Sequence, residues 1–264
     1  MRKVRISAVN YLNTKPFLYG LNSPAFRSKY EIELAHPAAC AEKLKVGESD
    51  IGLVPIALAK ELPGGKIVSN YCIGTEGKVK TVCLFSHVPL ENITKVVLDY
   101  QSKTSVALIQ LLMKNYWQKE VDWIRGMPGF ETQINDTTGG LVIGDRTIDL
   151  FEKYPYSYDL GEIWLTYTGL PFVFAVWTTY ADIDEELLTN FNQALQLGIE
   201  QIDSLLYLLT PQWKAPFDVS AYLKNNISYP LDDAKIKGMN QFLGAIGVKE
   251  LPRLIQTERS FLVN

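Results

Sequence analysis

The clearest candidate for ligand chemistry in this sequence is the run from Ser102 to Ser105, which opens an apolar-periodic segment that ends near Trp117. Ser102 is placed to cap a helix, and the free amides and dipole of a helix N-terminus favour a bound carboxylate or phosphate. The hydroxyls of Ser102, Thr104 and Ser105 would add hydrogen bonds to such an anion. The competing interpretation is a plain helix cap that uses one hydroxyl.

Further candidate residues follow predicted strands. Tyr11 and Asn13 come after the first apolar run and offer a phenol and an amide, although such residues are more often ordinary turn residues. Asp145 comes after the short apolar run Leu141–Gly144. Its carboxylate could act as a general base, but its spacing favours the cap of a helix over residues 147–153.

The stretch Thr168–Trp177 begins with turn-forming residues and continues as a nearly unbroken apolar run. This pattern predicts a strand buried on both faces, with Pro171 tolerated only near its start. Such a strand late in the chain indicates a return from a second lobe to the first. Thr168 and Gly169 would then lie at the junction, where ligands often bind. An interior strand without a ligand role is the alternative.

Other classes of site have no signal in the sequence. His36 and His87 have no obvious Ser, Cys or Asp partner with which to form a catalytic triad. The sequence also contains no Gly-rich phosphate loop, dinucleotide fingerprint or metal-ligand spacing. We therefore expect an anion-accepting cleft that uses no metal and no organic cofactor.

Composition narrows the choice of partner and compartment. The 264 residues carry a net charge of −3, which excludes a basic field for nucleic acid or an anionic membrane surface. No run of about 18 apolar residues is present, and the N-terminus does not resemble a signal peptide. The three cysteines fit structural thiols in a reducing compartment. We expect a cytoplasmic protein, and the sequence leaves its oligomeric state open.

Alternating strands and helices must position these residues. Strands over 4–9, 32–36 and 50–56 are separated by helical segments, which predicts βαβ units and a parallel sheet. We predict an α/β fold with one lobe from residues 1–88 plus 179–264 and another from 89–178. Crossings near 86–89 and 177–180 would make the cleft between the lobes hinged. Its expected lining is Asn10–Asn13, Gly74–Thr81, Ser102–Ser105, Gly144–Asp145 and Thr168–Gly169.

Five stretches together resemble the chorismate dehydratase family of the futalosine route to menaquinone. The resemblance implies the fold of type 2 periplasmic binding proteins, which agrees with the predicted hinged cleft. It also implies loss of water from chorismate to give 3-[(1-carboxyvinyl)oxy]benzoate, without a metal or organic cofactor. The stretches are Val9–Pro16, Asp50–Pro55, Ser102–Ser105, Leu141–Asp145 and Asp159–Trp177.

The resemblance also suggests roles for single residues. Asn13 and Thr81 would be catalytic, with Thr81 in place of an expected serine. Because an amide is far too weak a base, Asn13 would orient the substrate, whose own enolpyruvyl carboxylate would take the proton. Gly74 and Thr75 replace an expected pair of serines, so that only Thr75 keeps a polar side chain. The implied substrate-binding residues are Tyr11, Thr75, Ser102, Thr104, Ser105, Gly144, Asp145, Thr168 and Gly169.

Two other functions are compatible with the same pattern. A solute-binding or sensing protein for a small carboxylate would share the fold, although neither an export signal nor a DNA-binding module is apparent. Dihydroxynaphthoate synthase, the sister enzyme of the pathway, shares the fold as well. The motifs at Tyr11–Asn13 and Thr168–Trp177 favour the dehydratase.

Overall fold

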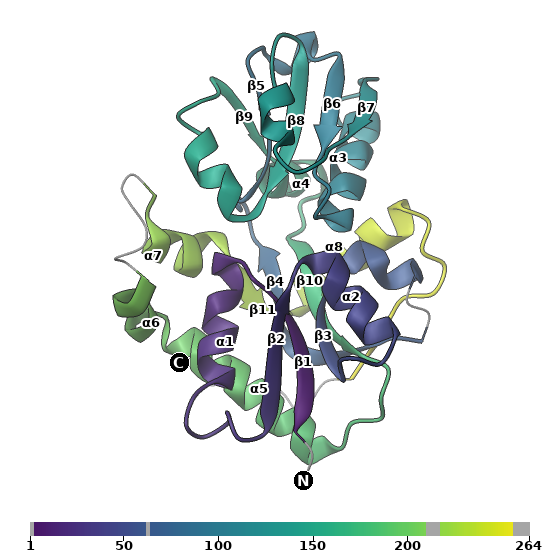
Figure 1. The fold of residues 1–264 in the computed structure, drawn as a ribbon. Helices are drawn as coiled ribbons and strands as arrows, with labels where there is room; N and C mark the ends of the chain where they lie inside the picture. Colours follow the sequence, from purple (N-terminus) through teal and green to yellow (C-terminus); the bar gives the residue numbers. More distant parts are fainter. Residues whose placement is uncertain (1–2, 62–63, 210–216, 256–264) are drawn as a thin grey trace.

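The computed structural model describes residues 3–61, 64–209 and 217–255, which form two α/β lobes, each built around its own sheet (Figure 1). The strand order of the first sheet is β11-β4-β10-β3-β1-β2, with β12 beside β4, and that of the second is β7-β6-β8-β5-β9. The first sheet contains β1 (Val4–Val9), β2 (Tyr30–Ala35), β3 (Ile51–Pro55), β4 (Lys66–Thr75), β10 (Phe172–Thr179), β11 (Ser228–Pro230) and β12 (Arg253–Leu254). The second contains β5 (Val82–Ser86), β6 (Lys95–Leu98), β7 (Asp122–Arg125), β8 (Thr138–Ile143) and β9 (Tyr156–Asp159).

Helices cover both sheets and connect their strands. In Figure 1, α1 and α5 lie on one side of the lower sheet and α2 on the other. The α-helices are α1 (Lys15–Leu21), α2 (Pro37–Lys45), α3 (Lys103–Asn115), α4 (Leu160–Thr168), α5 (Glu185–Glu200), α6 (Ile202–Leu209), α7 (Val219–Ala221) and α8 (Asp233–Ala245). Short 3-10 turns are η1 (Leu12–Thr14), η2 (Ile56–Glu61), η3 (Leu90–Asn92), η4 (Phe130–Gln133) and η5 (Gly144–Leu150), and η7 (Tyr222–Asn226) is a π-helical turn.

The predicted βαβ units are confirmed in the first lobe. Strand β1 pairs in parallel with β2 along its whole length and with β3 on its other side. The carboxyl ends of these strands therefore meet at one edge of the sheet. Tyr11 and Asn13 follow β1 at this edge.

Strand β10 is the predicted buried strand, and it returns the chain to the first sheet. It lies antiparallel between β3 and β4, and Trp177 is completely buried there. The edge of the Trp177 ring packs against Phe17 of α1 and Phe191 of α5, with ring centroids 5.7 and 5.2 Å away. One strand thus joins the sheet to two helices.

The expected lobe boundaries require correction. Strand β5 was expected in the first lobe, but it pairs with β8 and β9 of the second sheet. Strand β10 was expected largely in the second lobe, but it belongs to the first sheet. The chain therefore crosses between lobes at residues 76–81 and 169–171 instead of near 88 and 178. Apolar strands suit either sheet, and their pairing alone decided the lobe.

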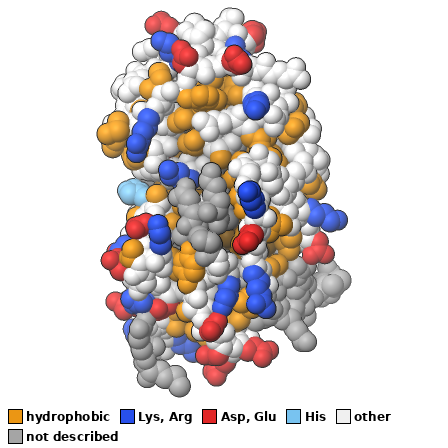
Figure 2. Space-filling model, turned by 90° about the vertical axis from the view of Figure 1, so that its right-hand side faces the viewer, with side chains coloured by type: hydrophobic (Ala, Val, Ile, Leu, Met, Phe, Trp, Pro, Cys, Tyr) orange, Lys and Arg blue, Asp and Glu red, His pale blue; other side chains and the backbone are white. Residues whose placement is uncertain are grey.

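The distribution of charged side chains on the surface and the state of the three cysteines agree with what the composition predicts. Figure 2 shows Lys and Arg interspersed with Asp and Glu over one face, without an extended basic field. Cys40, Cys72 and Cys83 are free and buried. In the described part of the chain, no helix is both long and apolar enough to cross a membrane.

The helix that follows Tyr11 and Asn13 is held by a close crossing of α1 and α5. Gly20 and Gly198 face each other where these helices meet. A Cβ on Gly198 would overlap the carbonyl oxygen of Pro16, and one on Gly20 would overlap that of Ala194. Because both neighbours are backbone atoms, neither can move aside without shifting a helix.

We expect Gly198→Ala to lower the free energy of unfolding by about 1–3 kcal/mol, the usual cost of overpacking. Gly244→Ala in α8 is the matched control, because a Cβ there meets no atom within 4 Å. That substitution should raise stability by up to about 1 kcal/mol through helix propensity. Urea unfolding of both variants measures the difference, and equal stabilities would contradict the close crossing.

Candidate functional site

A cavity lies between the lobes, at the edge where β1 ends, and its empty space of about 540 Å³ includes the part that is open to solvent. The second lobe contributes the N-terminus of α3, and the first contributes η1. The described residues that line the cavity are Val9, Tyr11, Asn13, Thr14, Pro37, Leu53, Pro55, Ile73, Val79, Thr81, Val82, Ser102, Ser105, Ile143, Gly144, Phe174 and Ala175.

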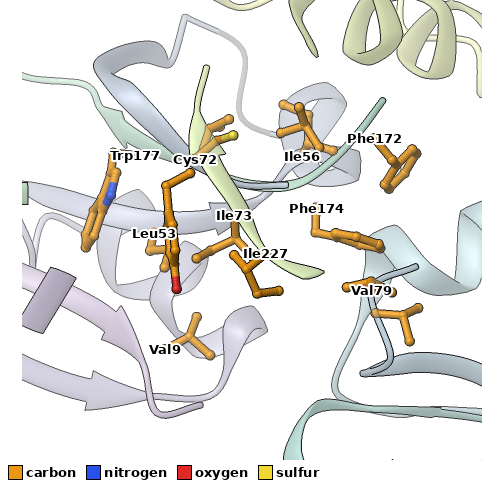
Figure 3. Packing of buried hydrophobic residues seen from close by; sticks show 14 of the residues in the cluster. Val9, Leu53, Ile56, Cys72, Ile73, Val79, Phe172, Phe174, Trp177 and Ile227 are labelled. Carbon is orange, nitrogen blue, oxygen red and sulfur yellow. The ribbon is translucent and has the colours of Figure 1, made fainter. Parts of the chain in front are cut away.

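One wall of the cavity is apolar. Val9, Leu53 and Ile73 come from β1, β3 and β4 of the first sheet, and Phe174 and Val79 lie close together beside them (Figure 3). All five side chains are at most 8% exposed. This wall excludes water and suits a ring, so that polar groups on the opposite side bind in a medium of low dielectric constant.

Two of the three hydroxyls predicted to bind an anion, those of Ser102 and Ser105, line the cavity, and the helix cap is formed as expected. The Ser102 Oγ accepts a hydrogen bond from the Ser105 amide at 3.0 Å and donates one to the Ser105 Oγ at 2.9 Å. The proton of the Ser105 hydroxyl is then left to donate to another oxygen. Capping and ligand binding are therefore compatible in this pair, because each hydroxyl can both donate and accept.

Tyr11 connects the lobes at the mouth of the cavity. Its hydroxyl donates to the Gln101 Oε1, which also lies 3.5 Å from Arg146 Nη2. The Tyr11 ring lies against Gly144, whose φ of +70° and contact distances leave no room for a Cβ. Burial raises the pKa of Tyr11, so the phenol stays protonated as a donor. Sequence reasoning missed Gln101, although its place just after β6 was a usable signal.

Arg146 is not available to a ligand as a free cation. It forms an ion pair with the buried Asp99 and another with Glu131 at 2.6 Å, and it lies over the ring of Tyr100. Among the described residues that line the cavity, only Tyr11 has an ionisable side chain. An anion in this cavity would therefore be held by neutral O–H and N–H donors and the dipole of α3.

Asp145 lies directly after Gly144 and has a different role from the one predicted. Both of its carboxylate oxygens accept the backbone N–H of Leu12, at 3.1 Å. The expected helix over 147–153 is replaced by the 3-10 turn η5, which Asp145 does not cap. Instead it connects the second lobe to η1 of the first. Burial raises its pKa to about 6, against the opposing effects of the Leu12 amide and Lys15.

Asn13 and Thr81 both line the cavity, and a residue from the C-terminal part of the chain lies between them. The Tyr222 hydroxyl is 2.8 Å from the Thr81 Oγ1. Burial raises the pKa of this phenol, and the nearby Asn13 side chain partly opposes that effect. The crossing before Thr81 is fixed by Asp159, which accepts the amides of Val79 and Lys80 at 3.2 and 2.7 Å. Sequence reasoning missed Tyr222, for which no local signal exists.

Five predicted site residues do not line the cavity, namely Asp145, described above, and Thr75, Thr104, Thr168 and Gly169. Thr75 hydrogen bonds the backbone of Gly77, and Gly74 lies inside the sheet between β10 and β11. Thr104 connects the lobes, because its hydroxyl accepts the Ala57 amide and donates to the Phe174 carbonyl, both at 3.2 Å. Thr168 and Gly169 end helix α4, which the sequence analysis did not predict, and that helix displaces them from the cavity.

No three His, Cys, Asp or Glu side chains of the described segments are close enough to ligate a metal ion.

The Asp145 carboxylate gives a testable pH dependence. Its pKa is about 6 in the folded protein and about 3.9 in an unfolded chain. The folded state therefore binds more protons between these values, and this group's contribution to stability falls as the pH rises through that window. The unfolding free energy of the wild-type protein, relative to that of Asp145→Asn, should fall between pH ~4 and ~6. Above pH ~6 this difference should stay constant.

Urea unfolding of both proteins at a series of pH values measures this difference. Asp149→Asn is the control, because Asp149 is exposed on the same turn. Its curve should run parallel to that of the wild type. Parallel curves for Asp145→Asn as well would show that Asp145 titrates alike in both states.

The chain was compared with known proteins. A family described as menaquinone biosynthesis matches residues 4–247. A chorismate dehydratase of Thermus thermophilus is 26% identical over 273 residues, which cover 96% of this chain and 98% of that protein.

Several solved structures share the fold. A protein of Archaeoglobus fulgidus superposes with a TM-score of 0.69 at 12% identity, covering 93% of this chain and 98% of that one. The periplasmic aliphatic sulphonate binding protein of Escherichia coli gives 0.59 at 15% identity, with 96% and 95% covered. A Candida albicans protein with the generic periplasmic binding protein fold gives 0.62 at 9% identity, with 98% and 99% covered.

These likenesses extend over both lobes. The predicted α/β fold of periplasmic binding proteins is confirmed, and the chain belongs to the menaquinone biosynthesis family.

Proposed function

We propose that this protein is a chorismate dehydratase, which eliminates water from chorismate to give 3-[(1-carboxyvinyl)oxy]benzoate. The observation that carries the proposal is the interlobe cavity, which is lined by neutral donors at the start of α3, by Asn13 and Thr81, and by an apolar wall. The relative from Thermus thermophilus supports the same reaction.

The chemistry of the substrate suits such a cavity. Chorismate has a flat, apolar diene ring, two carboxylates and a 4-hydroxyl that leaves. In the proposed pose, the ring lies against Phe174 and Val79, and the ring carboxylate accepts hydrogen bonds at Ser105 and the first turn of α3. Those donors would stabilise the negative charge that moves onto this carboxylate when the C3 proton is removed. Loss of the 4-hydroxyl then forms the aromatic ring.

The base in this proposal is the enolpyruvyl carboxylate of the substrate. It is supported by the lining of the cavity, in which the described side chains include no carboxylate, imidazole or amine. Asp145 follows the cavity residue Gly144 but does not itself line the cavity, and its carboxylate accepts the Leu12 amide. Asn13 would hold the substrate in the reactive pose, with its amide as donor.

Two alternatives remain distinct in their outcomes. A solute-binding or sensing protein would bind a small carboxylate and leave it unchanged. The likeness to the sulphonate binding protein is a likeness of the fold alone, and that fold would suit such a function. A dihydroxynaphthoate synthase would act on a later intermediate of the pathway and would not convert chorismate.

The deciding experiment is to incubate the purified protein with chorismate and to separate the mixture by chromatography. We expect 3-[(1-carboxyvinyl)oxy]benzoate to form in proportion to the protein added. A sample without protein corrects for spontaneous decay of chorismate. Binding measured by calorimetry without any product would overturn the proposal in favour of a binding protein.

Substitutions of Asn13 test its orienting role. Asn13→Ala should lower the single-turnover rate by about a hundredfold, because small misplacements of reacting groups are that costly. Its unfolding free energy should change by only about 1 kcal/mol, the value of a hydrogen bond. Asn13→Asp should lower both affinity and rate, because a carboxylate repels the dianionic substrate.

Asn22→Ala is the matched control, since the Asn22 side chain also makes one hydrogen bond, to the Leu18 carbonyl at 2.9 Å, but lies outside the cavity. It should keep the wild-type rate. Asn13→Asp could instead retain or raise activity with a carboxylate-like pH dependence. The new carboxylate would then be supplying a base that the wild-type enzyme lacks at this position, and the orienting role would be wrong.

A further inference from the structure

Tyr222 is a fully buried polar side chain that no feature of the sequence connected with the cavity. Its side chain has an exposed fraction of 0%. Its hydroxyl lies 2.8 Å from the Oγ1 of Thr81, which is 141 residues away in the sequence. The Asn13 side chain is also close to this hydroxyl.

The direction of this hydrogen bond follows from the partners of the two hydroxyls. Among the described residues, the Thr81 Oγ1 is the hydrogen-bond partner of the buried Tyr222 hydroxyl. Burial raises the pKa of Tyr222 far above its usual value, so the phenol keeps its proton. The phenol therefore donates this proton to the Thr81 Oγ1.

This arrangement leaves the Thr81 proton free. Within the protein, its other partner is the Val79 carbonyl at the long distance of 3.4 Å. Because Thr81 lines the cavity, its hydroxyl is poised to donate to a ligand oxygen instead. The chain of donors thus runs from Tyr222 through Thr81 into the cavity.

The fold holds Tyr222 firmly in this place. It begins the π-helical turn η7, and the Asn226 side chain at the end of that turn donates to the Lys78 carbonyl at 2.9 Å. Tyr229 lies in β11, the strand that follows η7, and its hydroxyl donates to the Asn13 carbonyl at 3.1 Å. The C-terminal segment is therefore fastened to both the crossing before Thr81 and the turn that carries Asn13.

We propose that Tyr222 is a positioning residue, which orients the Thr81 hydroxyl as a donor to a substrate oxygen. This inference rests on the proposed dehydratase function. No covalent step passes through Tyr222, because its proton stays on the phenol throughout.

A double-mutant cycle tests the proposal, using Tyr222→Phe, Thr81→Val and the two combined. Tyr222→Phe removes only the hydroxyl, and kcat should fall by about tenfold with KM little changed, as for a lost hydrogen bond. In the Thr81→Val background, the same change should have much less effect on kcat, because the two hydroxyls act as a unit.

Tyr30→Phe is the matched control. Tyr30 is also buried, and its hydroxyl has no hydrogen-bond partner among the described residues. This variant should keep the wild-type kcat. If Tyr222→Phe behaved like this control, or if its effect were the same with and without Thr81, the positioning role would be overturned.

Two further readouts separate this inference from the proposed function. If the wild-type protein binds chorismate without converting it, the dehydratase proposal fails, and the cycle is measured on the dissociation constant. The same four proteins are also unfolded in urea, because a hydrogen bond between the two hydroxyls gives a coupling in stability whatever the substrate. Absence of that coupling would disprove the inference by itself.

Discussion

The two lobes depend on the antiparallel pairing of β10 with β4. Phe172 at the start of β10 is the register partner of Thr75 at the end of β4, so the chain leaves and re-enters the first sheet side by side. The two crossings therefore form one narrow connection. Because β10 also completes the core around Trp177, it cannot shift without unpacking α1 and α5. The cavity lies directly beyond this connection.

The cavity combines an apolar wall with polar groups that are already oriented. The buried carboxylates around it are occupied with backbone amides: Asp145 holds η1, Asp159 holds the crossing before Thr81, and Asp99 holds the end of β8 through the Ile143 amide at 2.9 Å. Arg146 is neutralised by its acidic partners. What faces a ligand is a set of neutral donors, which suits an anion that must be held while its charge is redistributed.

Contacts across the cavity join residues that are remote in sequence. Tyr11 bonds Gln101, Leu12 bonds Asp145, and Ala57 bonds Thr104. Each pair has one member in each lobe, so the same bonds that shape the site also keep the lobes together. Separation of the lobes would break all of them at once, and a ligand between the lobes would compensate for part of that cost.

The sequence by itself determined the elements and part of the site. Periodicity and caps located β1, β3, α3 and the buried strand β10, and strand ends and a helix start pointed to Tyr11, Asn13, Ser102 and Ser105, because these signals are local. The lobe of β5, the outward places of Thr168 and Gly169 and the interlobe role of Asp145 were decided only by tertiary structure. Tyr222 belongs to the same group. Strand pairing and a hydrogen bond across 141 residues depend on which surfaces meet in space, and no local pattern records that.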